Sequence, residues 1–156
     1  MKTRLYILYF LSLSFYTSKG QSVSDISGLL DRLSGDSKSL SKTLDGTRIV
    51  SFGQSALMPL SKIFTDTSIT GVFSKCQSRY LTRGDLAIIF ADRIETMPYA
   101  RLTEVQNCLL QFCPDNPNWV EFYLDAVLRK GYSEFKNDYL VWLNSKERRR
   151  YLRHRY

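Results

Sequence analysis

One stretch of the chain, from Asn118 to Tyr132, constrains the fold more than any other. It is the densest apolar run with helical spacing, and its apolar residues are Trp119, Val120, Phe122, Tyr123, Leu124, Ala126, Val127 and Leu128. Arg129 and Lys130 followed by Gly131 mark its end, because cations stabilise the last helical turn and glycine readily adopts the left-handed conformation that stops a helix. Since the apolar residues cover more than one side, this stretch predicts a helix in the middle of a bundle.

Five further short helices are predicted around this one, within residues 56–145. The second of the six takes apolar residues at i, i+3, i+4, i+7 and i+11, counted from Ile69. The third begins at Thr82, with Asp85 three residues later as an acidic form of the capping box. The fourth follows Pro98, which is tolerated at a helix start. No segment shows a convincing two-residue alternation, so we expect an all-α fold: an antiparallel bundle of six helices with an N-terminal extension.

Two segments precede this helical region. Residues 21–55 are rich in Ser and Gly and predict a linker with one short amphipathic helix that starts near Ile26. Residues 1–20 begin with Lys2 and Arg4, continue with an apolar run too short to span a bilayer, and end in small residues. That order is typical of a secretory signal peptide, and the alternative is an apolar N-terminal helix.

The net charge of +7 is concentrated at the two ends of the chain. The last eleven residues carry +5, the first twenty carry +3, and the remainder carries −1. A body near neutrality favours a charge-patterned protein-binding surface over a phosphate-binding one. The basic tail, residues 146–156, could hold a membrane or an acidic partner. Nucleic acid is not an expected partner, because aromatic residues are sparse in the tail.

The reactive side chains give no pattern of an enzyme. The only histidine, His154, lies in the basic tail, and no zinc spacing, phosphate loop or paired-carboxylate site is present. An odd number of cysteines (Cys76, Cys108 and Cys113) does not suit a disulfide framework. Cys76 and Cys108 fall at apolar helical positions and are predicted to be small hydrophobic residues. We therefore expect no catalysis, no cofactor, no metal and no small-molecule substrate.

The tripeptide Arg83-Gly84-Asp85 spells an integrin-binding motif. It coincides with the predicted first turn of the third helix, where Asp85 serves as a cap. Because a helical turn does not present an extended loop, we expect a structural role for these residues.

Two local motifs resemble caspase recruitment domains (CARDs) of the death-fold superfamily. Residues 117–129, from Pro117 through Trp119 to Arg129, resemble the fifth helix of CARDs in viral-RNA-sensing helicases and in their mitochondrial antiviral adaptor, although Asn118 stands where glycine is usual. Residues 79–85 resemble the end of helix two and the start of helix three in the same group. The resemblance covers about residues 56–145. It implies a six-helix Greek-key bundle that binds other CARDs, often as helical filaments, in innate immune, antiviral or apoptotic signalling.

The resemblance also implies where a protein partner would bind. In CARDs one charged surface on helices one and four meets an opposite surface on helices two and three, a contact that can propagate without closing. Carried over to this chain, the first surface would hold Lys62, Arg101 and Glu104. The second would hold Arg79, Asp85, Asp92 and Glu95. A further contact near the corner of helices four and five would use Asp115, Glu121 and Asp125.

Two functions therefore stay open at the level of sequence. The first is a cytoplasmic CARD-only adaptor or regulator. The second is a secreted small helical binding protein, cytokine-like or lipid-carrying. The compartment separates them, because CARD partners are cytosolic whereas a cleaved segment at residues 1–20 would export the chain.

Overall fold

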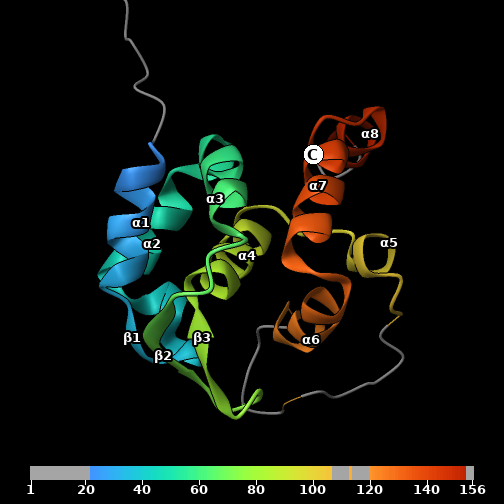
Figure 1. Cartoon of the computed structure of the whole chain (residues 1–156). Helices are drawn as coiled ribbons and strands as arrows, with labels where there is room; N and C mark the ends of the chain where they lie inside the picture. The colour runs from blue at the N-terminus through green and yellow to red at the C-terminus, as the bar shows by residue number, and fades with distance from the viewer. Residues whose placement is uncertain (1–21, 107–112, 114–119, 154–156) are drawn as a thin grey trace, which may run out of the picture.

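The computed structural model describes residues 22–106, 113 and 120–153 (Figure 1). Within these ranges the chain is mostly helical and contains a small three-stranded sheet, with η1 and η2 denoting 3-10 helices. The elements in chain order are α1 (Val23–Asp31), β1 (Ser34–Asp36), η1 (Ser37–Lys42), α2 (Leu44–Ser51), η2 (Gly53–Ala56), α3 (Leu57–Ile63), β2 (Ile69–Ser74), β3 (Arg79–Thr82), α4 (Arg83–Ile94), α5 (Tyr99–Thr103), α6 (Val120–Lys130), α7 (Tyr132–Leu143) and α8 (Lys146–Arg153).

The expectation of an all-α fold is wrong at residues 69–82, where a β-hairpin replaces the predicted second helix. β2 pairs antiparallel with β3, and β1 pairs parallel with the other side of β2. The β-branched and aromatic residues of this segment favour strand, and the short turn after β2 lets the chain reverse. Val72 is buried whereas Ile69 and Phe73 are exposed, so the apparent helical spacing does not describe one buried face.

Residues 22–55 contain the predicted short amphipathic helix as α1, but the rest of this segment, predicted as a linker, is a folded part of the protein. Ser22 and Asp25 form a capping box at the start of α1, and Thr43 caps α2. Ile26, Leu40 and other apolar side chains of this segment are completely buried in the main core. The Ser and Gly content thus supplies caps and tight turns between short helices rather than a flexible connection.

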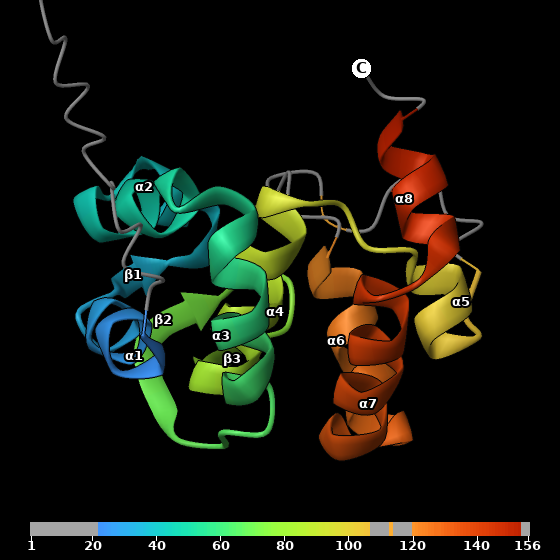
Figure 2. The same cartoon turned by 90° about the horizontal axis from the view of Figure 1, so that it is seen from above.

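The helix α4 lies between two groups of elements (Figures 1 and 2). α1, α2, α3 and the sheet occupy one side of it, and α5, α6, α7 and α8 occupy the other. One continuous cluster of buried side chains joins the two sides, because α4 contacts α3 and α6 while α3 contacts α7. The predicted capping box of Thr82 and Asp85 is confirmed, and Leu86, Ile89 and Phe90 of this helix are buried.

The helix α6 matches the predicted fifth helix at its C-terminal end. It ends at Lys130, and Gly131 follows with a φ of 94°. Leu124 and Val127 are buried, but Leu128 is 57% exposed. The apolar surface of α6 therefore faces the core on one side only, and the helix packs at the edge of the molecule instead of at its centre.

Cys76 and Cys113 form a disulfide, which corrects the expectation that Cys76 is a free apolar residue in a helix. Their Cα atoms are 5.7 Å apart and their sequence separation is 37. The bond joins the hairpin turn after β2 to the connection between α5 and α6. Cys108 lies outside the described residues. In the part of the chain that the structure describes, no helix combines the length and apolarity needed to cross a bilayer.

Candidate functional site

The C-terminal helix α8 is attached to the body by a buried ion pair. Arg148 donates from Nε and from a terminal nitrogen to the two carboxylate oxygens of Glu95, at 2.5 and 2.8 Å. The Glu95 side chain is only 3% exposed and also accepts from the amide of Gln54. This fork-to-fork geometry fixes the orientation of α8 as well as its position, and it raises the pKa of Arg148 above its usual value.

Three further contacts support the same attachment. Ser145 caps α8, because its Oγ accepts from the backbone N–H of Arg148 at 3.0 Å. Arg101 on α5 pairs with Glu147 at the surface. The guanidinium of Arg148 also lies 5.9 Å from the ring centroid of Trp142, a cation–π distance. These anchors hold one side of α8 against α4, α5 and α7.

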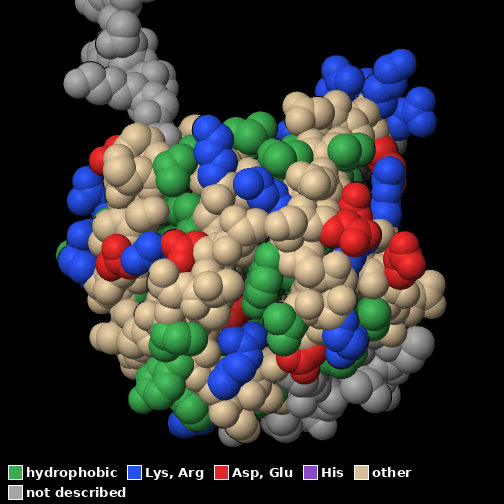
Figure 3. Space-filling view, in the orientation of Figure 1, with side chains coloured by type: hydrophobic (Ala, Val, Ile, Leu, Met, Phe, Trp, Pro, Cys, Tyr) green, Lys and Arg blue, Asp and Glu red, His purple; other side chains and the backbone are tan. Residues whose placement is uncertain are grey.

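The opposite side of α8 carries what we call the cationic face: Lys146, Arg149, Arg150 and Arg153. These residues are spaced at i, i+3, i+4 and i+7, which places them along one stripe of a helix. All four side chains are exposed, and Lys and Arg gather over this helix in the space-filling view (Figure 3). Among the described residues, no carboxylate forms an ion pair with any of the four.

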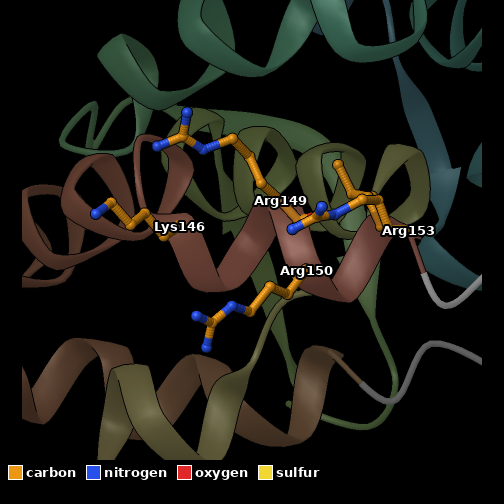
Figure 4. Close-up of a pocket in the computed structure, with 5 residues that line it drawn as sticks. Lys146, Arg149, Arg150 and Arg153 are labelled. Atoms are coloured by element: carbon orange, nitrogen blue, oxygen red, sulfur yellow. The ribbon is translucent and has the colours of Figure 1, made fainter.

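The cationic face lines an open surface hollow. Its volume is about 630 Å³, and Leu152 also lines it in the part of the chain that the structure describes. Arg149 and Arg150 extend to opposite sides of α8 in the close-up, with Lys146 nearer the start of the helix and Arg153 nearer its end (Figure 4). A hollow with four cations and no facing carboxylate among the described residues is suited to holding an anionic partner by charge-assisted hydrogen bonds.

The sequence predicts that the basic tail could contact an acidic partner. It does not predict that one side of this helix is attached to the body while the other side carries the cationic face, although the order of its residues contains a signal for that division. Glu147 and Arg148 lie on a different side of the helix from Lys146, Arg149, Arg150 and Arg153. A helical projection of the sequence would therefore have separated the two groups. What the sequence could not give is the partner of Arg148, because Glu95 is 53 residues away along the chain.

Several residues predicted to bind a protein partner are buried structural groups instead. Asp85 is completely buried and accepts from Arg79 at 2.6 Å, from the Thr82 backbone at 2.9 Å and from the Tyr132 hydroxyl at 2.9 Å. The pKa of Tyr132 is raised to about 12. Burial of the hydroxyl is the main cause, and the negative charge of the Asp85 carboxylate is the second. Arg79 lies on β3 and not on a helix. This network joins the hairpin, α4 and α7, and Asp85 cannot contact a partner in the folded protein.

The integrin-like tripeptide is engaged in the same region. Arg83 bridges Asp31 at 2.5 Å and Asp66 at 2.7 Å. Gly84 is buried, and a Cβ at this position would lie 2.4 Å from the carbonyl oxygen of Phe64. With Asp85 buried as well, the three residues form the start of α4 as expected, and none of them presents an extended binding loop.

Two other predicted contact residues are also buried. Glu121 at the start of α6 is completely buried, and its carboxylate accepts from the Ser74 hydroxyl on β2. Glu95 holds Arg148, as described above. Asp92 is half-buried, and its carboxylate accepts from the backbone N–H of Met97 at 2.9 Å. Glu121 and Glu95 therefore join elements of the fold. Because both are buried, neither can belong to the binding surfaces that the resemblance implies.

The remaining predicted residues lie on the surface without forming one site. Lys62 on α3, Arg101 on α5 and Asp125 on α6 are exposed, and Glu104 follows the end of α5. Within the described residues, no hydrogen bond or ion pair joins any two of these four. Asp115 lies outside the described residues.

Two other kinds of site are poorly supported by the structure. The residues that the structure describes contain no group of three or more His, Cys, Asp or Glu side chains placed to hold a metal ion. A second hollow is lined by residues of α5, α6 and α7 and of the segment after α5. Its lining includes two acids, Glu104 and Glu134, and two cations, Arg129 and Lys130, so its charges largely offset one another. The cationic face is therefore the strongest candidate site.

No protein-family model matches this sequence, and neither a curated protein nor a solved structure was found to be similar to it.

Proposed function

We propose that this chain is an exported, non-enzymatic binding protein that holds an anionic macromolecule on the cationic face of α8. The observation that carries the proposal is the arrangement of that helix. One side is fixed by the Glu95–Arg148 pair, and the other side presents four exposed cations. A fixed helix holds these cations in place before a partner arrives, so less conformational entropy is lost on binding.

Two features support export. Disulfides persist in oxidising compartments and are rare in the cytosol, and the Cys76–Cys113 bond joins two separate parts of this fold. The order of charged, apolar and small residues in 1–20 is that of a secretory signal, a segment that lies outside the described residues.

The first experiment measures binding of the full chain to three polyanions: heparin, a DNA duplex and poly-glutamate. The face variant R149A/R150A/R153A is compared with the matched control K42A/R48A/K62A, which removes three exposed cations from other elements. Affinity for at least one polyanion should fall at least tenfold in the face variant and less than about twofold in the control. Equal losses in both variants would assign the binding to net charge and overturn the proposed site.

The second experiment tests the compartment. A C-terminally tagged full chain is expressed in secretory cells, and the medium is assayed for a product that has lost residues 1–20 and contains the disulfide. Retention of the uncleaved chain in the cytosol, with Cys76 and Cys113 reduced, would contradict export.

A CARD-type interaction module is the second candidate function. It is favoured by the exposed charges Lys62 and Asp125, which remain available for a homotypic contact, whereas Arg101 already pairs with Glu147. The β-hairpin at residues 69–82, in the place of the second helix, and the burial of Asp85 and Glu95 favour the exported binding protein instead. Charge reversal at Lys62 tests the candidate, because a CARD-type contact requires this change to weaken self-association or partner binding.

A further inference from the structure

We infer that the anionic partner of the cationic face is a linear polysaccharide that carries sulfate groups. This inference rests on the proposed function and names the chemistry of the ligand at the same site.

The shape of the cationic face suits a chain-like ligand. From Lys146 to Arg153 the stripe extends over seven residues, which is about 10 Å at 1.5 Å per residue. Its cations extend to both sides of α8 and do not converge on one enclosed point. A ligand with anionic groups repeated along its length can contact several of them at once, whereas a single small anion can contact only part of the stripe.

The composition of the face favours sulfate over carboxylate. Three of the four cations are arginines, whose guanidinium is more weakly hydrated than an ammonium. A sulfate ester is likewise more weakly hydrated than a carboxylate, so the two groups lose less water on pairing, while the planar guanidinium still donates two parallel hydrogen bonds. Arg153 is further positioned by a hydrogen bond from its Nε to the carbonyl oxygen of Arg149, at 3.3 Å. Sulfate stays ionised at every physiological pH, so a sulfated chain keeps its charge wherever an exported protein meets it.

The same face is poorly suited to nucleic acid. Single-stranded nucleic acids are held largely by bases that stack on aromatic side chains, and the described residues that line this hollow include none. A helix that reads duplex DNA must enter the major groove, and α8 is attached along one side to α4, α5 and α7. Backbone phosphates remain a possible weak ligand, so DNA is an arm of the test.

A membrane surface is also a weaker match. An interfacial helix buries an apolar side in the lipid while its cations lie at the headgroups. In α8 the side opposite the cations faces the body of the protein, where Arg148 pairs with Glu95, so it is not free to enter lipid. Leu152 is half-buried. None of the exposed large hydrophobic residues among the described side chains lies on α8.

The test titrates the full chain with heparin, with chemically desulfated heparin that keeps its carboxylates, with a DNA duplex of equal charge, and with vesicles containing phosphatidylserine. We expect heparin to bind at least tenfold more tightly than each of the other three at the same salt concentration. R149A/R150A/R153A should lose that preference, and R149K/R150K/R153K, which keeps the charge, should bind heparin three- to tenfold more weakly than the native chain.

The outcomes separate this inference from the proposed function. Equal binding of native and desulfated heparin, tighter binding of DNA or vesicles, or full affinity in R149K/R150K/R153K would overturn the sulfate assignment while the cationic face remained a binding site. Failure of R149A/R150A/R153A to weaken binding to any polyanion would overturn both. A urea unfolding curve for each variant confirms that a loss of binding is not a loss of fold.

Discussion

The helices α4 and α8 both begin with charged residues, but they use them in opposite ways. At the start of α4, Arg83 bridges two carboxylates and Asp85 accepts three hydrogen bonds inside the protein. In α8 only Glu147 and Arg148 have ion-pair partners among the described residues, and the cationic face has none. The same residue types therefore stabilise the fold in one helix and remain available to a ligand in the other. What differs is whether an acidic partner lies within reach.

The largest expected effect on the free energy of unfolding is at the buried charged network of α4. Asp85→Ala leaves Arg79 and the Tyr132 hydroxyl without their partner, and loss of one member of a buried charged network costs about 3–5 kcal/mol of the free energy of unfolding. Urea denaturation measures it. Asp125→Ala, at an exposed acid on α6, is the control and should change the same quantity by less than about 0.5 kcal/mol. Similar values for both variants would show that Asp85 is not a structural group.

The disulfide gives the next effect. C76A/C113A removes the cross-link over a separation of 37 residues and should lower the free energy of unfolding by about 2–4 kcal/mol. Reduction of the native chain should produce a similar loss, and the double variant should not respond to reductant. A native chain with the same urea midpoint before and after reduction would contradict the prediction.

The hydroxyl of Tyr132 gives a smaller effect that depends on pH. Its pKa is raised to about 12, so it binds its proton more tightly in the folded protein than in the unfolded chain. The resulting stability is fully present below pH 10, the ordinary tyrosine pKa, and is lost as pH rises towards 12. Tyr132→Phe should cost roughly 1–2 kcal/mol at neutral pH and should flatten this decline. An unchanged decline in the variant would assign the pH dependence to another group.

The smallest expected effect is at the cationic face. R149A/R150A/R153A should change the free energy of unfolding by less than about 0.5 kcal/mol, because exposed cations without partners contribute little to stability. Thermal and urea unfolding both measure it. A loss above about 1 kcal/mol would mean that these side chains support the fold, and the contrast with α4 would then disappear.

The sequence predicted best where a local signal was enough. The capping box of Thr82 and Asp85 and the stop at Gly131 both depend on neighbouring residues, and both are confirmed. The hairpin was missed because Ile69, Val72 and Phe73 also satisfy helical spacing over a short run. Their β-branched and aromatic character was the competing signal, and it agrees with the structure.

The site was harder to predict than the helices because it depends on contacts between distant residues. Charges that looked equivalent in sequence differ completely in their surroundings: Asp85 and Glu121 are buried, whereas Asp125 is exposed. The partners Glu95 and Arg148 are 53 residues apart, and Cys76 meets Cys113 across 37. No periodicity reports such pairs. Folding of residues 22–55 into the core likewise depends on the surfaces of α3 and α4 that they cover.

The cross-link between Cys76 and Cys113 also determines how the molecule responds to mechanical force. Pulled from its two ends, the oxidised chain transmits tension through the sulfur atoms, so the residues between the two cysteines, including all of α4 and α5, carry no load. With 37 residues bypassed, its fully stretched length is shorter by roughly 12 nm than that of the reduced chain. Single-molecule stretching in the presence and absence of reductant would display that difference directly.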